Sequence, residues 1–450
     1  MKVINYILLL FLISLAIGCQ SKKAQKSDYP QRFTYDVDLN TVNVKKEGLK
    51  DIDSLLQSYV DDKKVNCVTA FIAKGGHVIY NKAFGLKDIE DSIPAGLDDY
   101  YVLFSQTKAI TTVAFMTLVE KGLVEINDPV SKYFPKIPDE VVTKVNDDGT
   151  YETRPVRTPM TFAHLMSHTS GLNAGLVSEI RKRENRKSTD LSEFGKIEVP
   201  QKPHGQRSFG SNPDSEYLED EMLDLVKYPL GFDPGSEWNY HVSTNMLAYM
   251  VEIISGKPLQ DYVKETILQP LGMNNTAWYF TPDHLSKFVK PYNYVDGKLI
   301  PGSTMYAEGA ISKKQNYAEG AIGLNGPIKD YARFCQMLLN KGTFNGNRIL
   351  KAETIEQMTT INRLPEVNSG GKGFQFGLGF QLANENNKHI DAVSNSAYWW
   401  GGLMGTEYII DPEHDLIALF YINMFQRENL YHDYLREVFD LVQPGKKNEK

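Results

Sequence analysis

The sequence predicts an α/β protein of the α+β type, with one antiparallel sheet built from both chain ends and flanking helices. Three observations lead to this prediction. β-rich apolar segments occur near the start, at residues 67–85, and near the end, at residues 405–423. The residues between them show mainly helical periodicity, and a helical segment at residues 429–442 follows the last strands. The helical middle is therefore expected to form an inserted subdomain.

Composition sets broad limits on function. The chain has 450 residues, of which 42% are hydrophobic and 23% charged, enough for one large core or for two to three domains. The formal net charge of −7 is spread along the chain, which argues against a nucleic-acid partner. Besides Cys19, the cysteines are Cys67 and Cys335. Two buried free thiols are favoured over a disulfide between them, although pairing stays open.

The N-terminus resembles an export signal. Lys2 supplies a positive charge, and the apolar run at residues 7–17 is shorter than the roughly 20 residues that span a bilayer. Gly18-Cys19 then resembles a bacterial lipobox, with Ala16 where Leu is usual. We expect residues 1–18 to be a lipoprotein signal peptide and Cys19 to carry the lipid. The alternative is a plain signal peptide with an incidental cysteine.

A lipid on Cys19 would make the membrane a partner and the bacterial cell envelope the location. Gln20 favours the outer membrane under the rule known for enteric bacteria, while the side of that membrane stays open. Residues 19–45 are polar and are expected to be a tether, residues 46–442 the folded domain, and residues 443–450 a disordered tail.

The expected elements follow in chain order. A helix within residues 48–62 places four apolar side chains on one face: Ile52, Leu55, Leu56 and Tyr59. Gly75-Gly76 then marks a hairpin, and apolar spacing predicts a helix over residues 107–120.

The later segments divide into a loop, two helices and two strands. Residues 175–220 are charged and rich in Ser, Gly and Pro, so we expect a long excursion on the active-site side, with a lid as one interpretation. Helices are expected to end at Gly256 and Gly342, and the last two strands to turn at residues 411–414.

Ser105 and Lys108 form a Ser-x-x-Lys pair at a helix start. This spacing places the lysine one turn from the serine on the same face, where its amine can act as a base. The helix N-terminus adds positive potential that lowers a lysine pKa. The alternative is a plain N-cap serine. A second pair, Ser369 and Lys372, lies in a glycine-rich loop that is unsuited to this geometry.

The segment FSQTKAITTVAFMTLVEKGLVEINDPVSKYFP resembles the nucleophile segment of the serine β-lactamase-related superfamily. That group includes class C β-lactamases, D-Ala-D-Ala carboxypeptidases and β-lactamase-like esterases. Five further segments resemble its landmarks in order: TFAHLMSHTSGL, LGFDPGSEWNYHVSTNMLAYMVEIISG, PLGMNNT, AIGLNGPIKDYARFCQMLLNKG and YWWGGLMGTEYIIDP. The resemblance covers residues 50–440. It implies a β-lactamase/transpeptidase-like fold and a serine hydrolase that needs no metal or cofactor.

The resemblance also assigns site residues. Ser105 is the nucleophile, Lys108 its base, and Tyr240 a proton relay whose pKa the lysine is expected to lower. The backbone N–H groups of Ser105 and Leu403 form the oxyanion hole. The substrate cleft contains Trp400, Gly401, Gly402 and His241. Of the adjacent Trp399 and Trp400, one is expected to pack in the core and the other to face the cleft.

Three functions stay open at this stage. An esterase acting on a small-molecule ester or amide is favoured. A β-lactamase or D-Ala-D-Ala carboxypeptidase is the alternative, disfavoured because Val242 and Trp400 replace polar residues of those enzymes. A non-catalytic binding lipoprotein is the third. His164 and His168, four residues apart on an expected helix, are interpreted as structural, because no third metal ligand is evident.

Overall fold

The computed structural model describes residues 29–184, 216–311, 315–366, 368–425 and 429–442. The signal peptide and lipidation site predicted at residues 1–19, most of the predicted excursion, and the tail at residues 443–450 lie outside the described residues. None of the helices in the described part is long and apolar enough to cross a membrane.

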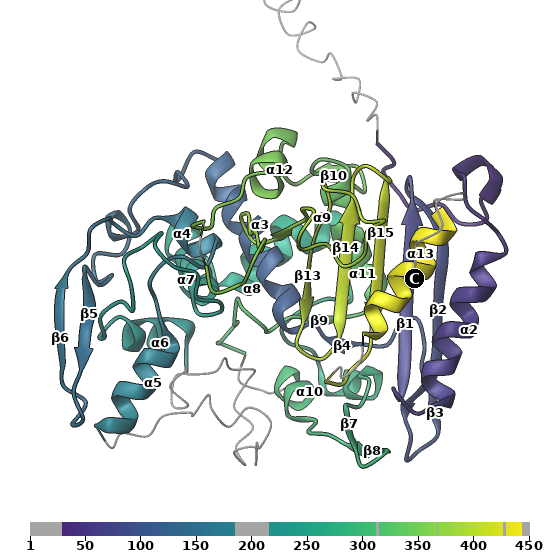
Figure 1. Cartoon of the computed structure of the whole chain (residues 1–450), viewed down its shortest axis with the longest axis horizontal. Coiled ribbons are helices and arrows are strands. Elements are labelled where there is room, and N and C mark those ends of the chain that lie inside the picture. Colours follow the sequence, from purple (N-terminus) through teal and green to yellow (C-terminus); the bar gives the residue numbers. More distant parts are fainter. Residues whose placement is uncertain (1–28, 185–215, 312–314, 367, 426–428, 443–450) are drawn as a thin grey trace, which may run out of the picture.

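The sheet joins the two ends of the chain, as predicted (Figure 1). It has seven strands in the order β12-β13-β14-β15-β1-β2-β3, and its pairs are antiparallel. The β1 and β15 strands pair in its centre, with Phe71 opposite Leu419. The strands are β1 (Cys67–Lys74), β2 (His77–Asp88), β3 (Ile93–Pro94), β12 (Gln381–Leu382), β13 (Tyr398–Gly402), β14 (Thr406–Asp411) and β15 (Leu416–Tyr421).

Each face of the sheet belongs to a different hydrophobic cluster. On β15, Leu419 and Tyr421 pack with the helical subdomain, while Ala418 and Phe420 pack on the opposite side. That opposite side is covered by α2 (Gly48–Asp61) and α13 (Leu430–Val442), which lie side by side (Figure 1). The first face is covered by α11 (Ile328–Leu339).

The helix that follows Ser105, α3 (Thr107–Glu120), has the predicted bounds. It lies in the middle of the molecule (Figure 1). All of its residues from Thr107 to Leu118 are buried, because α7 (Ser243–Ser255) and α8 (Leu259–Val263) pack against it. The Phe162 ring of α4 (Phe162–Met166) also lies 4.7 Å from that of Phe115 in α3. Further helices of this part are α5 (Ala174–Arg183), α6 (Leu218–Leu225), α9 (Gln269–Leu271), α10 (Met305–Ala310) and α12 (Ala352–Thr359).

Two predictions about helices need correction. The segment expected as an irregular excursion begins inside α5 and ends with α6. Although α5 is short and rich in charge, the Asn173 side chain caps it by accepting the Leu176 N–H at 2.9 Å, and Val177 is buried. The predicted end of α11 at Gly342 is also wrong. The helix stops at Leu339 and is capped by Asn340, and the two residues with positive φ, Lys341 and Gly342, follow that cap.

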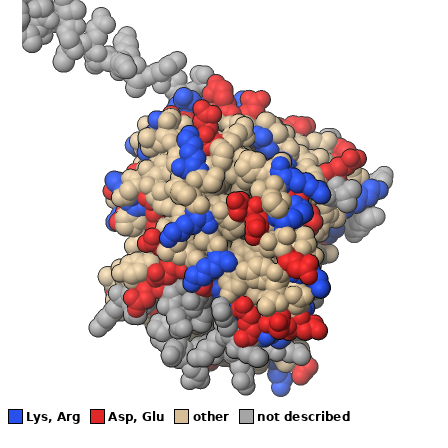
Figure 2. All heavy atoms as spheres, turned by 90° about the vertical axis from the view of Figure 1, so that its left-hand side faces the viewer, with Lys and Arg blue, Asp and Glu red and all other residues tan. Residues whose placement is uncertain are grey.

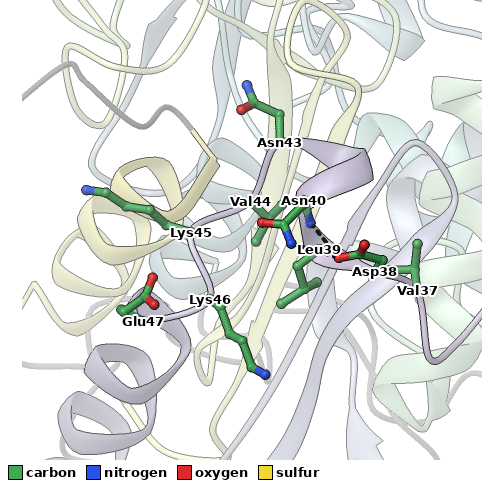
Figure 3. Close-up of a pocket in the computed structure, with 9 residues that line it drawn as sticks. All are labelled: Val37, Asp38, Leu39, Asn40, Asn43, Val44, Lys45, Lys46 and Glu47. Carbon is green, nitrogen blue, oxygen red and sulfur yellow. Dashed lines mark hydrogen bonds between the residues drawn. The ribbon is translucent and has the colours of Figure 1, made fainter.

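Residues 29–45, expected as tether, pack against the domain instead. Gln31 O accepts the Asn345 N–H at 2.8 Å, and the Phe33 ring lies 5.2 Å from that of Phe71. Residues 37–40 and 43–47 line a pocket of about 640 Å³, and Figure 3 shows their side chains. There Asp38 Oδ1 accepts the Asn40 N–H at 3.1 Å. The packed chain therefore begins before residue 46.

The two thiols agree with the prediction of free, buried cysteines. Cys67 and Cys335 are free and buried.

Two short hairpins, β5 (Glu140–Val145) with β6 (Tyr151–Pro155) and β7 (Tyr292–Val295) with β8 (Lys298–Pro301), were not predicted. On the face that carries β5, β6 and α5, acidic and basic side chains are interspersed across the described residues (Figure 2).

Candidate active site

Ser105 lies in a 3₁₀ turn, η2 (Phe104–Gln106), which leads directly into α3. The turn begins with a strained residue, because Phe104 has a φ of 45°, unusual for a residue with a bulky side chain. Its buried ring packs edge-on against Tyr306 at 4.8 Å. Packing thus fixes a bent backbone that presents the Ser105 hydroxyl at a partly exposed position.

The Lys108 amine contacts the Ser105 hydroxyl from one turn further along. Its Nζ donates to Ser105 Oγ at 3.0 Å and to the Ala321 carbonyl at 2.9 Å. The residue is only 2% exposed. Burial lowers the pKa of Lys108 to about 7, and Glu319 acts in the opposite direction. The predicted juxtaposition of Ser105 and Lys108 is present in this geometry.

Tyr240 comes from the segment before α7 and lies beside Ser105 and Lys108. Its ring centroid lies 4.6 Å from Lys108 Nζ, and its phenol lies close enough to Ser105 for the serine to lower the Tyr240 pKa. Trp400 Nε1 donates to the phenol oxygen at 2.9 Å. The expected lowering of the Tyr240 pKa is wrong. Burial raises the pKa of Tyr240, more than Ser105 and Trp400 lower it.

The two adjacent tryptophans of β13 face opposite sides, as predicted. Trp399 is 3% exposed and its ring lies 4.6 Å from that of His389, on the side of α13. Trp400 is partly exposed and faces Tyr240. Strand alternation thus places one ring in the core and the other at the candidate site.

Gly401 and Gly402 lie beside the site for reasons of packing. A Cβ on Gly402 would come within 2.4 Å of the Leu103 carbonyl oxygen, just before the Ser105 turn. A Cβ on Gly401 would overlap the Glu407 carboxylate. Both glycines therefore let β13 approach its neighbours closely, and neither lines the cavity at Ser105.

A cavity of about 320 Å³ opens at Ser105. Leu403 and His241, both predicted site residues, line it. The other lining residues are Phe104, Ser105, Asn173, Ala174, Gly175, Asn239, Tyr240, Val242 and Ile322. The residues at the start of α5 were indicated in one respect, since the segment from residue 175 was expected on the active-site side.

The prediction that His164 and His168 lie on one helix is wrong. His164 lies in α4, where its backbone and ring form a capping box with Thr161. The helix ends at Met166, so His168 follows it with a φ of 59°, and its ring lies 4.7 Å from that of Tyr240. His168 Nδ1 accepts the His241 N–H at 3.3 Å. Burial lowers the pKa of His168 and of His241 well below the usual value, so both rings are neutral at pH 7.

The geometry supports neither a catalytic role for the second Ser-x-x-Lys pair, Ser369 and Lys372, nor a metal site. Ser369 lies in an irregular loop, where its hydroxyl donates to the Trp238 carbonyl at 2.6 Å. Within the described ranges, no group of three or more His, Cys, Asp or Glu side chains is arranged to hold a metal ion.

The chain is similar to known proteins over most of its length. The β-lactamase family model matches residues 52–441. Esterase EstB of Burkholderia gladioli is 24% identical over 392 residues, which cover 83% of this chain and 89% of that protein. A putative D-alanyl-D-alanine carboxypeptidase of Escherichia coli strain K12 is 25% identical over 443 residues, covering 92% of this chain and 90% of the relative.

Among solved structures, EstCE1, described as a hydrolase with promiscuous acyltransferase activity, superposes with a TM-score of 0.69. It is 22% identical, and the match covers 88% of this chain and 99% of EstCE1. With the family match, this likeness confirms the predicted fold.

Proposed function

The chain belongs to the β-lactamase family, and on that premise we propose that it is a serine hydrolase that cleaves esters through an acyl-enzyme. Relatives named as esterases support this choice: EstB, and a lovastatin esterase that is 25% identical over 395 residues. The observation that carries the proposal is the 3.0 Å hydrogen bond between the buried Lys108 amine and the Ser105 hydroxyl.

In the first step, Ser105 Oγ attacks the substrate carbonyl carbon, and Lys108 takes the hydroxyl proton as the O–C bond forms. A pKa of about 7 supports this role, because a large share of the lysine is then neutral at physiological pH. The N–H groups of Ser105 and Leu403 are proposed to stabilise the oxyanion. Such a donor contributes on the order of 3 kcal/mol to transition-state stabilisation.

In the second step, the tetrahedral intermediate expels the alcohol. The Tyr240 phenol gives its proton to the leaving oxygen, and the Lys108 ammonium restores that proton. The raised pKa of Tyr240 supports a role as proton donor, since the phenol is protonated at neutral pH. Water then attacks the acyl-enzyme by the same steps in reverse, which releases the carboxylic acid and regenerates Ser105.

The test compares the wild-type domain with Ser105→Ala on p-nitrophenyl acetate, p-nitrophenyl butyrate and nitrocefin. We expect ester turnover that Ser105→Ala abolishes while circular dichroism stays unchanged. Ser369→Ala is the matched control, because that serine belongs to the rival Ser-x-x-Lys pair and should leave turnover intact. Full activity in Ser105→Ala would refute the mechanism.

A β-lactamase or D-Ala-D-Ala carboxypeptidase is the second candidate, favoured by the name of the Escherichia coli relative. Two residues of this chain argue against it. Val242 provides no amide, and Trp400 provides no cation for the carboxylate of such substrates. Nitrocefin turnover faster than ester turnover would reverse the ranking.

A non-catalytic binding protein of the same fold is the third candidate, since fold alone does not give activity. The intact trio of Ser105, Lys108 and Tyr240 argues against it. A fluorophosphonate probe distinguishes a serine hydrolase from a non-catalytic binding protein, because it labels an activated serine even where the natural ester is unknown. Labelling that Ser105→Ala removes would exclude the binding protein.

A further inference from the structure

A short segment, residues 319–324, runs along the nucleophile helix and is fixed to it by side chains of α3. Thr111 Oγ1 donates to the Gly320 carbonyl at 2.8 Å, and Thr107 Oγ1 accepts the Leu324 N–H at 3.1 Å. Lys108 Nζ donates to the Ala321 carbonyl between them. The lysine amine is thus positioned by this segment as well as by its own helix.

The Asn245 amide links the same segment to two buried carboxylates. Its Oδ1 accepts the Ala321 N–H at 3.0 Å. Its Nδ2 donates to Glu319 Oε1 at 3.2 Å and to Glu221 Oε1 at 3.3 Å. Glu319 is fully buried and Glu221 is 4% exposed. The Tyr317 hydroxyl also donates to Glu221. Buried carboxylates are costly, so their place behind the nucleophile needs an explanation.

The charges around Lys108 indicate what Glu319 does. From the end of α4 the lysine faces His168, and from the segment before α7 it faces Tyr240 and His241. Burial keeps both histidines neutral and Tyr240 protonated at pH 7. Glu319 is the neighbour that favours the charged lysine.

Three titratable groups near Glu319 lie on the described elements packed around it. These are Tyr306 on α10, Glu221 on α6 and Lys108 on α3. Of the three, Lys108 is the cation, so its ammonium and the Glu319 carboxylate offset part of each other's cost of burial.

We propose that Glu319 is the counter-charge of Lys108, a positioning residue that sets the base strength of the lysine. Asn245 supports it by holding both the carboxylate and the Ala321 peptide to which the lysine donates. The inference rests on the proposed function, because it takes Lys108 to be the base for Ser105.

The first test is the pH dependence of kcat/KM for wild type, Glu319→Gln and Glu221→Gln. The glutamine at 319 keeps an acceptor for Asn245 but removes the charge, so the lysine loses its proton more easily. We expect the acid limb of the profile to move to lower pH by about one unit. Glu221→Gln is the matched control on the same amide and should leave the limb in place.

If Glu319 had only a structural role, Glu319→Gln would lower kcat/KM at every pH without moving the acid limb of the profile. That result would overturn the proposal. Equal shifts in both variants would also overturn it, because the effect would then not belong to Glu319. If the wild-type protein shows no turnover that depends on Ser105, the proposed function itself is refuted.

The second test needs no activity. Urea midpoints of wild type, Lys108→Met, Glu319→Gln and the double variant form a cycle that isolates the interaction of the pair. At pH 6 we expect the double variant to lose less stability than the two single losses combined, and at pH 9 this difference should shrink. If Glu319→Gln alone fails to fold, recovery of folding in the double variant carries the same meaning. No coupling at pH 6, or no recovery, would contradict the pairing.

Discussion

At Lys108, burial and a nearby carboxylate shift the pKa of the side-chain amine in opposite directions. Burial is the larger effect and brings the pKa to about 7, while Glu319 limits the fall. A base acts in its neutral form, so activity should be lost as the pH falls through this value and gained as it rises. We expect kcat/KM for p-nitrophenyl butyrate to rise from about pH 5.5 to about pH 8, with its midpoint near 7.

A profile that is flat over this range would contradict the assignment of Lys108 as the base. The control is the uncatalysed hydrolysis of the same ester at each pH, which is subtracted. Circular dichroism at each pH separates a protonation effect from loss of the fold.

The two tryptophans of β13 allow a matched pair of substitutions. Trp400→Phe removes the 2.9 Å hydrogen bond to Tyr240 and retains an aromatic ring. A lost hydrogen bond of this kind costs about 1 kcal/mol, so we expect kcat to fall about fivefold. Steady-state kinetics on p-nitrophenyl butyrate measures the effect.

Trp399→Phe is the control, because that ring packs on the α13 side of the sheet, away from Tyr240. It should lower the free energy of unfolding while kcat stays within about twofold. A larger loss of kcat in Trp399→Phe than in Trp400→Phe would show that packing of the sheet, and not the hydrogen bond, governs turnover.

At the scale of elements, the site depends on how closely β13 approaches the Ser105 turn. A methyl group on Gly402 would meet the Leu103 carbonyl oxygen at 2.4 Å and the Thr406 hydroxyl at 2.1 Å. The strand must then move away from the turn. We expect Gly402→Ala to destabilise the protein by about 1–3 kcal/mol and to reduce kcat more than tenfold.

Urea unfolding and ester kinetics measure the two effects of Gly402→Ala. Gly96→Ala is the control, because a Cβ there would meet only Asp99, at ordinary contact distances from 3.6 Å. Unchanged kcat in Gly402→Ala would mean that the position of β13 is irrelevant to catalysis.

Elements with strong periodicity could be predicted from the sequence, and weakly buried ones could not. The α3 helix and the β1–β2 and β14–β15 hairpins carry apolar spacing that fixes their type. The β5–β6 hairpin is mostly exposed, so no apolar alternation reveals it. Helix α5 depends on a cap and two buried aliphatic residues within a charged segment.

The residues of the candidate site also differ in how far the sequence could predict them. Ser105 and Lys108 are three residues apart, so local spacing could indicate them. Tyr240 and Leu403 lie far along the chain and could be assigned only through resemblance to a family. Glu319 and Asn173 reach the site through tertiary packing alone, and no local pattern marks them.

At the scale of the whole molecule, pairing of β1 with β15 closes the fold around both chain ends. The first described residues extend this arrangement, since Asn340 Nδ2 donates to the Pro30 carbonyl at 2.7 Å. Packing of the domain therefore begins about ten residues after Cys19.

This arrangement leads to a prediction about location. We propose that residues 1–18 direct export and that Cys19 carries a lipid at the cell envelope. Cys19→Ser, expressed as the full chain in a bacterium, should then move the protein from the membrane fraction to the soluble fraction. The kcat/KM for a soluble ester should stay unchanged, because Ser105 and its partners lie within the packed domain.

Fractionation with immunoblotting, together with metabolic labelling by a radioactive fatty acid, measures the result. Ser21→Ala is the control next to the lipidation site and should remain labelled and membrane-bound. Membrane retention of Cys19→Ser without label would mean that an uncleaved signal peptide holds the protein. Release of the wild type into the soluble fraction would favour a plain signal peptide, with Cys19 incidental to a hydrolase that works free of the membrane.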